Sequence, residues 1–172
     1  MKLMKKGFTL IELLVVIGIL AILMAIVLVA VNPGRQFASA RNTERQAHLH
    51  EITSAIYQFA SQHNGNLPAT TFDANGEGNF PTAGDCDSNP ASGTAIGTSG
   101  FNLAAAGARE ASGAGPADTD LIVSTYIAAV PEDPSTGSAA DTGYTICLDS
   151  DTGRITARAP DAELGATIEI TR

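Results

Sequence analysis

The chain has 172 residues, and its eighteen Asp and Glu outnumber its ten Lys and Arg, for a formal net charge of −8. All three lysines fall among the first six residues, so the rest of the chain contains none. Such a chain lacks the clustered cations that bind a phosphate backbone, which argues against nucleic acid as a partner. The length suits one modest soluble domain behind an apolar N-terminal segment.

An apolar run from Phe8 to Val31 makes up that segment. At about 1.5 Å per residue it would form a helix of roughly 36 Å, enough to cross a hydrocarbon core of about 30 Å. A cleaved secretory signal is shorter and ends in small residues, whereas Asn32-Pro33-Gly34 follows this run. We therefore expect a membrane-length helix that stays with the protein.

The one charged residue of the run is Glu12. A carboxylate in such a helix costs about 2.5–3.5 kcal/mol at the bilayer centre and is by default a candidate functional residue. A simpler interpretation is a capping box, because Thr9 and Glu12 have the T-x-x-E spacing that satisfies free N–H groups at a helix start. The sequence leaves both interpretations open.

The residues Gly7-Phe8-Thr9-Leu10-Ile11-Glu12, behind a leader with Lys2, Lys5 and Lys6, resemble the cleavage and assembly signal of type IV pilins and pseudopilins. The resemblance implies that a membrane prepilin peptidase removes residues 1–7, cutting between Gly7 and Phe8, and methylates the amino group of Phe8. It also implies that Glu12 meets the ammonium group of Phe8 in a neighbouring subunit. In a filament core without water, these two charges compensate each other only when they are packed together.

The charges near the helix leave its orientation almost balanced, because Arg35, Arg41 and Arg45 follow it as closely as the lysines precede it. The resemblance and the two cysteines place the C-terminal part outside the cytoplasm. We thus expect a precursor in the cytoplasmic membrane, and then an extracellular pilus or a periplasm-spanning pseudopilus.

Pro33 and Gly34 predict a kink or break, because proline removes a backbone donor and clashes with the preceding turn. This is either a simple membrane exit or, by the resemblance, a point that softens when subunits pack. An amphipathic helix is expected within 32–66, ending at Asn64-Gly65-Asn66. Its apolar stripe contains Leu49, Ile52, Ala55, Ile56, Phe59 and Ala60, with Glu44, Arg45, Glu51 and Gln58 expected largely off it.

Residues 67–172 are expected to form a globular head that begins with a Gly-, Ala- and Ser-rich irregular stretch over 69–116. We predict a short helix over 103–111, interrupted by Gly107. Cys86 lies inside this stretch, and a disulfide to Cys147 would stabilise the head by roughly 4 kcal/mol through loss of unfolded-chain entropy. Two buried thiols are the alternative. A thiolate metal site needs more cysteines than two.

A second helix is predicted over 118–129, with Asp118 or Thr119 as its cap. The sequence Pro131-Glu132-Asp133-Pro134, followed by Gly143-Tyr144, resembles a segment of many pseudopilins and bacterial pilins. Ser135 stands where the major pseudopilins of type II secretion have tryptophan, which weakens that particular assignment.

Three strands are predicted at the C-terminus, over 143–148, 154–159 and 166–171. They would form an antiparallel meander packed on the amphipathic helix. The expected fold class is α+β, a type IV pilin-like fold with one long N-terminal helix and a small C-terminal sheet.

Few residues suggest chemistry. Asp73, Asn75 and Glu77 are spaced like the start of an EF-hand loop, which makes them weak calcium candidates. Gly84 stands where the closing glutamate belongs, so a solvated loop is the stronger interpretation and we expect no bound metal. Asp149 and Asp151 fit a hairpin turn better than a ligand set. His48 and His50 are two residues apart and face different sides of a helix. We expect no cofactor and no enzyme activity.

The sequence therefore predicts a structural filament subunit, with identical or related subunits, the prepilin peptidase and an inner-membrane assembly platform as partners. The alternatives are a pseudopilin of a type II secretion or DNA-uptake system, and a membrane-anchored extracellular binding module or enzyme. The sequence leaves open whether the subunit is major or minor and which system uses it.

Overall fold

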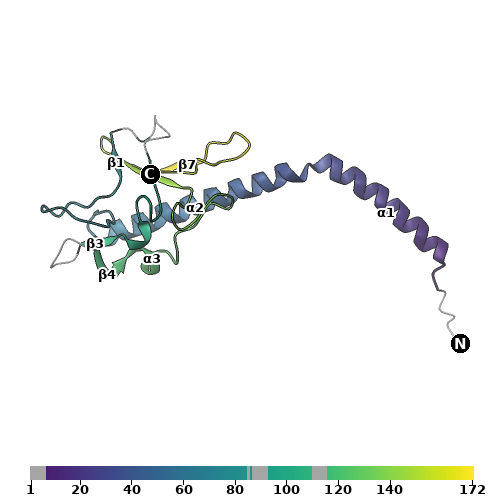
Figure 1. Ribbon diagram of the computed structural model, residues 1–172, viewed down its shortest axis with the longest axis horizontal. Helices are drawn as coiled ribbons and strands as arrows, with labels where there is room; N and C mark the ends of the chain where they lie inside the picture. The colour runs from purple at the N-terminus through teal and green to yellow at the C-terminus, as the bar shows by residue number, and fades with distance from the viewer. Residues whose placement is uncertain (1–6, 85, 87–92, 110–115) are drawn as a thin grey trace. The chain divides into compact units, whose positions relative to one another are not determined.

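The computed structural model of the chain describes residues 7–84, 86, 93–109 and 116–172 (Figure 1). The predicted leader, with Lys2, Lys5 and Lys6, therefore lies outside the described residues except for Gly7. The chain divides into two compact units, Met1–Ala38 and Ser39–Arg172. The architecture is α+β, as predicted.

The first unit contains helix α1 (Leu10–Val31), in which no residue is buried. The helix ends at Asn32, whose backbone is left-handed (φ 44°, ψ 80°). Pro33 then opens helix α2 (Pro33–Gln62), where its fixed φ suits the first helical position and its missing N–H costs nothing. The predicted break is therefore present, with Asn32 as its non-helical residue.

Helix α2 supplies one side of the core of the second unit. Leu49, Ile52, Ile56 and Phe59 are fully buried, which confirms the predicted stripe. The helix ends at Gln62, just before the predicted stop at Asn64-Gly65-Asn66. Gly65 has a φ of 86°, in the left-handed region, and its N–H donates to the carbonyl of Ala60 (2.8 Å).

The predicted meander is confirmed. Strand β5 (Thr145–Asp149) pairs antiparallel with β6 (Ile155–Arg158), which pairs antiparallel with β7 (Glu169–Thr171). The other edge of β5 carries two short strands that the sequence analysis did not predict. They are β1 (Thr82–Ala83), which is parallel to β5, and β2 (Thr94–Ala95), which is antiparallel to it.

A second, two-stranded sheet lies within the same unit. It pairs β3 (Gly107–Arg109) with β4 (Pro116–Leu121), between the short 3-10 helix η1 (Leu103–Ala105) and the single turn α3 (Ile122–Thr125). In Figure 1, β1 and β7 lie above the C-terminal part of α2, and β3, β4 and α3 lie below it.

Two helix predictions are wrong. The helix predicted over 103–111 ends after η1, because the chain pairs as β3 from Gly107 onward. The helix predicted over 118–129 is mostly absent, because its first residues belong to β4. Ser124, at φ 76°, then turns the chain out of α3. In both places the pairing with a neighbouring strand overrides a weak local helix preference.

One charged side chain contradicts the predicted polarity of α2. Arg45 was expected largely off the apolar stripe, yet its side chain is completely buried. Its guanidinium forms an ion pair with the buried carboxylate of Asp133 (Nε to Oδ2, 2.6 Å). The core of this unit thus joins α2 to the loop after α3 through a polar contact as well as through apolar packing.

Candidate functional site: the N-terminal helix and its flanks

Gly7, Phe8 and Thr9 precede α1 without regular structure. The Phe8 side chain is 86% exposed, and a Cβ built on Gly7 would meet no heavy atom within 4 Å. The bond between Gly7 and Phe8, where the sequence predicts cleavage, therefore lies in an open segment directly before the first helical turn.

Glu12 forms a capping box with Thr9. Its Oε2 accepts hydrogen bonds from the backbone N–H (2.9 Å) and the hydroxyl (2.6 Å) of Thr9, and its own N–H donates to that hydroxyl oxygen (3.3 Å). This is the simpler of the two interpretations that the sequence left open. The carboxylate remains exposed, so the capping box fixes its position at the first turn without enclosing it.

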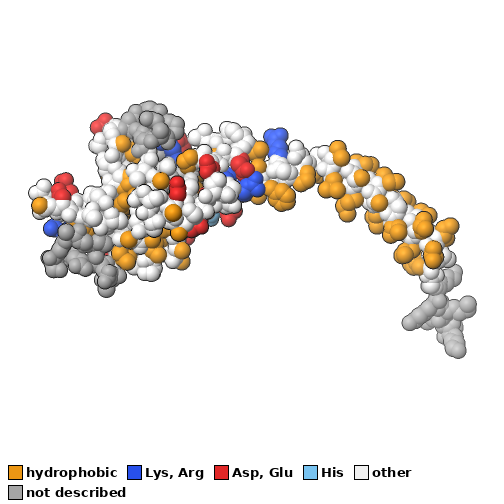
Figure 2. Space-filling view, in the orientation of Figure 1, with side chains coloured by type: hydrophobic (Ala, Val, Ile, Leu, Met, Phe, Trp, Pro, Cys, Tyr) orange, Lys and Arg blue, Asp and Glu red, His pale blue; other side chains and the backbone are white. Residues whose placement is uncertain are grey.

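The face of α1 that Figure 2 shows is largely apolar, and Glu12 is the one charged residue of the helix. Its large apolar side chains are about half or more exposed. Among the described residues, α1 is the one helix long and apolar enough to cross a membrane, judged by length and composition. An apolar surface of this extent needs lipid or another apolar protein surface to cover it.

The break at Asn32 leaves carbonyl groups of α1 and N–H groups of α2 without helical partners. The carbonyl of Asn32 accepts a hydrogen bond from the N–H of Arg35 (3.1 Å), which begins the ladder of α2. Gly34 lies inside the first turn of α2, so the predicted pair Pro33 and Gly34 opens the second helix.

Cys86 and Cys147 form the predicted disulfide, with 5.9 Å between their Cα atoms. Cys147 lies in β5, and Cys86 follows β1, so the bond ties Cys86 to β5. The Asp149 carboxylate, also in β5, accepts a long hydrogen bond from the N–H of Cys86 (3.5 Å).

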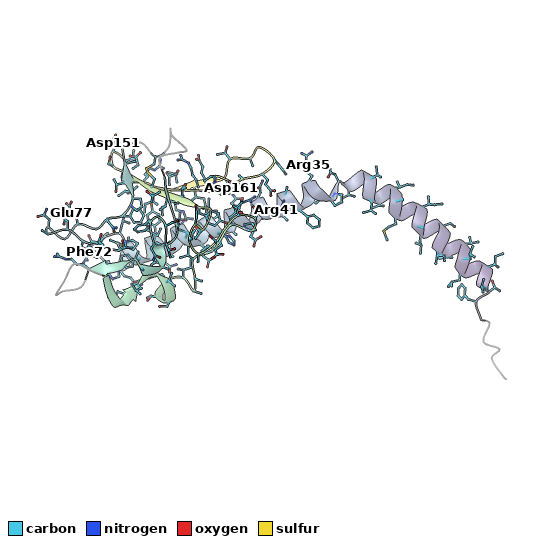
Figure 3. All side chains as sticks on the ribbon, viewed as in Figure 1. Arg35, Arg41, Phe72, Glu77, Asp151 and Asp161 are labelled. Atoms are coloured by element: carbon cyan, nitrogen blue, oxygen red, sulfur yellow. A yellow bond between two sulfur atoms is a disulfide. The ribbon has the colours of Figure 1, made fainter. Side chains whose placement is uncertain are left out.

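The loop that contains Asp73, Asn75 and Glu77 is built around one carboxylate. Oδ1 of Asp73 accepts hydrogen bonds from the backbone N–H groups of Asn75 (2.9 Å) and Glu77 (2.8 Å). The hydrogen bond from the Glu77 N–H, followed by smaller contributions, lowers the pKa of the Asp73 carboxyl. Figure 3 labels Phe72 and Glu77 on this loop. Among the described residues, no group of three or more His, Cys, Asp and Glu side chains could hold a metal ion.

The two histidines of α2 face different environments, as the spacing predicts. Nδ1 of His48 lies 2.7 Å from the hydroxyl of the buried Tyr144, and Nε2 lies 3.9 Å from Glu44. His50 faces the side chain of Arg172 (3.5 Å). Both histidines thus have polar neighbours on separate faces of α2.

A polar cluster that the sequence analysis missed surrounds Arg45. Its Nη2 donates to Oδ1 of Asp133 (3.1 Å) and to the Ser135 hydroxyl (2.7 Å), and its Nη1 donates to Glu163 (3.2 Å). Burial by itself would raise the pKa of the Asp133 carboxyl, but hydrogen bonds from Arg45 and Ser135 outweigh it and hold that pKa well below its usual range. The spacing of Arg45 to Leu49 already places it in phase with the buried stripe.

The sequence model of the prokaryotic N-terminal methylation motif, the signal of type IV pilins and pseudopilins, matches residues 2–28. No curated protein and no solved structure matches the chain. The matched range includes Gly7, Phe8, Glu12 and most of α1, and it ends before the break at Asn32.

Proposed function

From the methylation motif, which marks the chain as a type IV pilin-like or pseudopilin precursor, we propose that it is the structural subunit of a pilus-like filament. In this proposal the chain is cut between Gly7 and Phe8, is methylated at Phe8 and polymerises through α1. The observation that carries the proposal is the coincidence of the motif with a helix that buries none of its apolar surface within the chain. Such a helix is stable in a membrane, and equally in a bundle of identical helices.

Glu12 is proposed to pair with the N-terminal ammonium of a neighbouring subunit. The capping box holds the carboxylate at the first turn of α1, close in the chain to Phe8. Glu12 is the one charged side chain of the apolar run, so burying either its carboxylate or the Phe8 ammonium alone would be costly, and burying both together offsets much of that cost. The pairing would thus favour one particular displacement between neighbouring subunits along the filament axis.

The same proposal assigns the location and the partners. The precursor is anchored in the cytoplasmic membrane by α1, with Ser39–Arg172 outside the cytoplasm, where the disulfide is stable. The prepilin peptidase and an inner-membrane assembly platform act on it before it joins other subunits. A pseudopilin of a type II secretion or DNA-uptake system is the second candidate, since it would carry the same motif.

Two variants separate the charge of Glu12 from its capping role. Glu12→Gln keeps a side-chain oxygen that can accept from the Thr9 N–H but removes the charge. Thr9→Ala keeps the carboxylate but removes the hydroxyl of the capping box, at a cost of about 1 kcal/mol. In cells that contain the prepilin peptidase, we expect Glu12→Gln to reduce sheared filaments at least tenfold, and Thr9→Ala to leave them nearly unchanged.

Mass spectrometry of the membrane-bound protein provides the control for this experiment. Wild type and both variants should lack residues 1–7 and carry one methyl group on Phe8. Full-length wild-type protein in peptidase-positive cells would contradict the proposed function itself. Normal filaments from Glu12→Gln, with loss of filaments in Thr9→Ala, would instead show that capping matters and the charge does not.

A further inference from the structure

The first turns of α2, residues 33–40, are helical but gain little from packing. All of these residues are exposed except Ala38, and Ala38 does not belong to the buried apolar cluster. Most helical stability in proteins comes from packing of an apolar face, and an isolated helix shorter than about 12–15 residues is marginal in water. A stretch of this length with one buried alanine should therefore open easily.

The local sequence weakens these turns further. Gly34 is a poor helix former, and Arg35 places a cation in the first turn, where the helix dipole disfavours it and no acidic residue offsets it. The Asn32 side chain accepts only a long hydrogen bond from the Arg35 N–H (3.4 Å). Because Asn32 is left-handed, the hydrogen-bond ladder of α1 does not continue into α2. Residues 33–40 thus begin a new helix under unfavourable local conditions.

From Arg41 onward, α2 is fastened to the connection between β6 and β7. The Asn42 amide donates to the carbonyl of Glu163 (2.8 Å) and accepts from its N–H (2.9 Å). The Glu163 carboxylate accepts two hydrogen bonds from the Arg41 guanidinium (2.6 and 2.7 Å). Figure 3 labels Arg35 and Arg41 on α2 and Asp161 on this connection. The helix therefore changes from exposed to fastened at Arg41.

The connection is also held from its other side. The Arg45 Nη1 donates to Glu163 (3.2 Å) and to the Asn42 side-chain oxygen (2.9 Å), while its Nε is paired with Asp133 (2.6 Å). The Thr136 hydroxyl donates to the exposed Asp161 carboxylate (2.6 Å). Opening α2 beyond Arg41 would break bonds of this network, whereas opening the turns before Arg41 breaks none of those named here.

We propose that the connection between β6 and β7 acts as a stop on α2. Residues 33–40 open and close while Ser39–Arg172 otherwise stays folded, and Glu163 prevents the opening from passing Arg41. Local opening of this kind is expected where buried apolar contacts are few and the backbone hydrogen bonds are exposed to solvent. The stop lies ahead of Leu49, the first apolar residue of α2 that is completely buried, so it protects the core.

Such a stop frees the anchor without loosening the core. Helix α1 must suit a bilayer and, under the proposed function, a bundle of neighbouring α1 helices. Opening of residues 33–40 lets α1 adopt the direction that each of these surroundings requires, while the disulfide and the buried cluster stay intact. This use in assembly rests on the proposed function, whereas the stop itself is a property of the single chain.

Hydrogen exchange at single amides of the full chain in detergent tests the opening. Each helical N–H bonds to the carbonyl four residues earlier, so opening of residues 33–40 exposes the amides of residues up to 44. We expect the amides of 37–44 to exchange about a hundredfold faster than those of 49–56, with protection beginning at Arg45. Equal protection of the two ranges would overturn the proposal.

Glu163→Ala tests the stop. Arg45 keeps Asp133 as its partner in this variant, so the opening should extend only to residue 44, and the amides of 45–48 should exchange about tenfold faster while those of 52–56 stay within about twofold. Glu169→Ala is the matched control, because Glu169 follows in the same C-terminal segment but pairs with Arg158 on β6 (2.9 Å).

The control should leave the amides of 45–48 unchanged. Unchanged exchange of these amides in Glu163→Ala, or an equal change in Glu169→Ala, would overturn the stop. Faster exchange throughout α2 and β6 in Glu163→Ala would show that Glu163 stabilises the whole unit, which also contradicts the proposal.

Gly34→Ala should shift the exchange in the opposite direction. A Cβ at Gly34 would lie 3.7 Å from the side-chain oxygen of Asn32, an ordinary contact, so alanine fits and favours the helix. We expect the amides of 37–44 to exchange about fivefold more slowly, with those of 45–48 unchanged. No slowing would contradict the local opening. Because all three variants are measured unassembled, a chain that is not cleaved or forms no filament contradicts the proposed function alone.

Discussion

Arg45 and Asp133 form an ion pair in which both side chains are completely buried. Removing one partner from such a pair leaves an uncompensated charge in the core, which typically costs about 3–5 kcal/mol. The cost falls on the junction between α2 and the loop after α3, because each partner comes from one of these segments.

Asp133→Asn should therefore lower the free energy of unfolding of the full chain in detergent by about 3–5 kcal/mol at pH 7. The exposed neighbour Glu132 provides the control, and Glu132→Gln should change stability by no more than about 0.5 kcal/mol. Chemical denaturation followed by circular dichroism measures both. Equal stability of the two variants would show that the ion pair contributes little.

The same variant should change the acid response. The pKa of Asp133 is lowered by folding, so its contribution is present above the unfolded value of about 3.9 and is lost as pH falls toward the folded pKa. Asp133→Asn should remove the part of the acid destabilisation below about pH 4 that Asp133 causes. A remaining part belongs to Glu163, whose pKa is lowered chiefly by the hydrogen bond from Arg41.

The burial of Arg45 was predictable at the residue scale. Positions 45, 49, 52, 56 and 59 recur at alternating steps of four and three, so the arginine extends the apolar stripe by one turn. Its partner was less accessible, because Asp133 is eighty-eight residues away and only the fold brings the two together. Helical periodicity identifies a buried face, but it does not identify what that face meets.

At the element scale, the two shortest strands of the main sheet flank one end of the disulfide in the chain. Strands β1 and β2 have two residues each and both pair with β5. Cys86 lies between them in the chain and is bonded to Cys147 in β5. The bond joins residues 61 positions apart in the sequence. Closing a loop of that length lowers the entropy of the unfolded chain, which stabilises the folded state by about 4 kcal/mol at 25 °C.

Replacing both Cys86 and Cys147 by serine should lower the free energy of unfolding by about 2–4 kcal/mol. Hydrogen exchange should show where the order is lost, with the amides of β1 and β2 exchanging faster while those of β6 keep their protection. Uniformly faster exchange across β1, β2 and β6 would mean that the bond stabilises the whole unit and does not act on the short strands in particular.

The wrong helix predictions also belong to this scale. Gly107 has backbone neighbours so close that a Cβ would lie 2.6 Å from the carbonyl oxygen of Asp120. That close approach allows β3 to pair with β4 and draws residues 116–121 out of the predicted helix. Gly107 within a weak helical pattern was the available sign in the sequence that the helix is interrupted. The sequence does not show that β4 is the strand that Gly107 approaches, because the tertiary fold brings the two together.

At the scale of the whole molecule, the core and the apolar anchor belong to different parts of the chain. The buried apolar cluster lies between Leu49 and Ala159, while α1 buries none of its residues. The sequence predicted this division well, because a long apolar run and an alternating C-terminal pattern are strong local signals. The irregular stretch between them has weak signals, and there the short strands were missed.

A fragment from Arg35 to Arg172 should therefore fold without the anchor. It retains the full buried cluster, the disulfide and the contacts of Arg41, Asn42 and Arg45, so we expect a soluble monomer with one cooperative thermal transition. Analytical ultracentrifugation and circular dichroism measure both properties, with the full chain in detergent as the control.

The same fragment separates the structural role from the alternative of an anchored enzyme or binding module. A filament subunit without α1 should neither polymerise nor join filaments of the intact chain, because it lacks the apolar surface that α1 exposes. A fragment that folds, stays monomeric and yet binds a ligand tightly would favour a binding module. A fragment that forms filaments by itself would show that the head, and not α1, drives assembly.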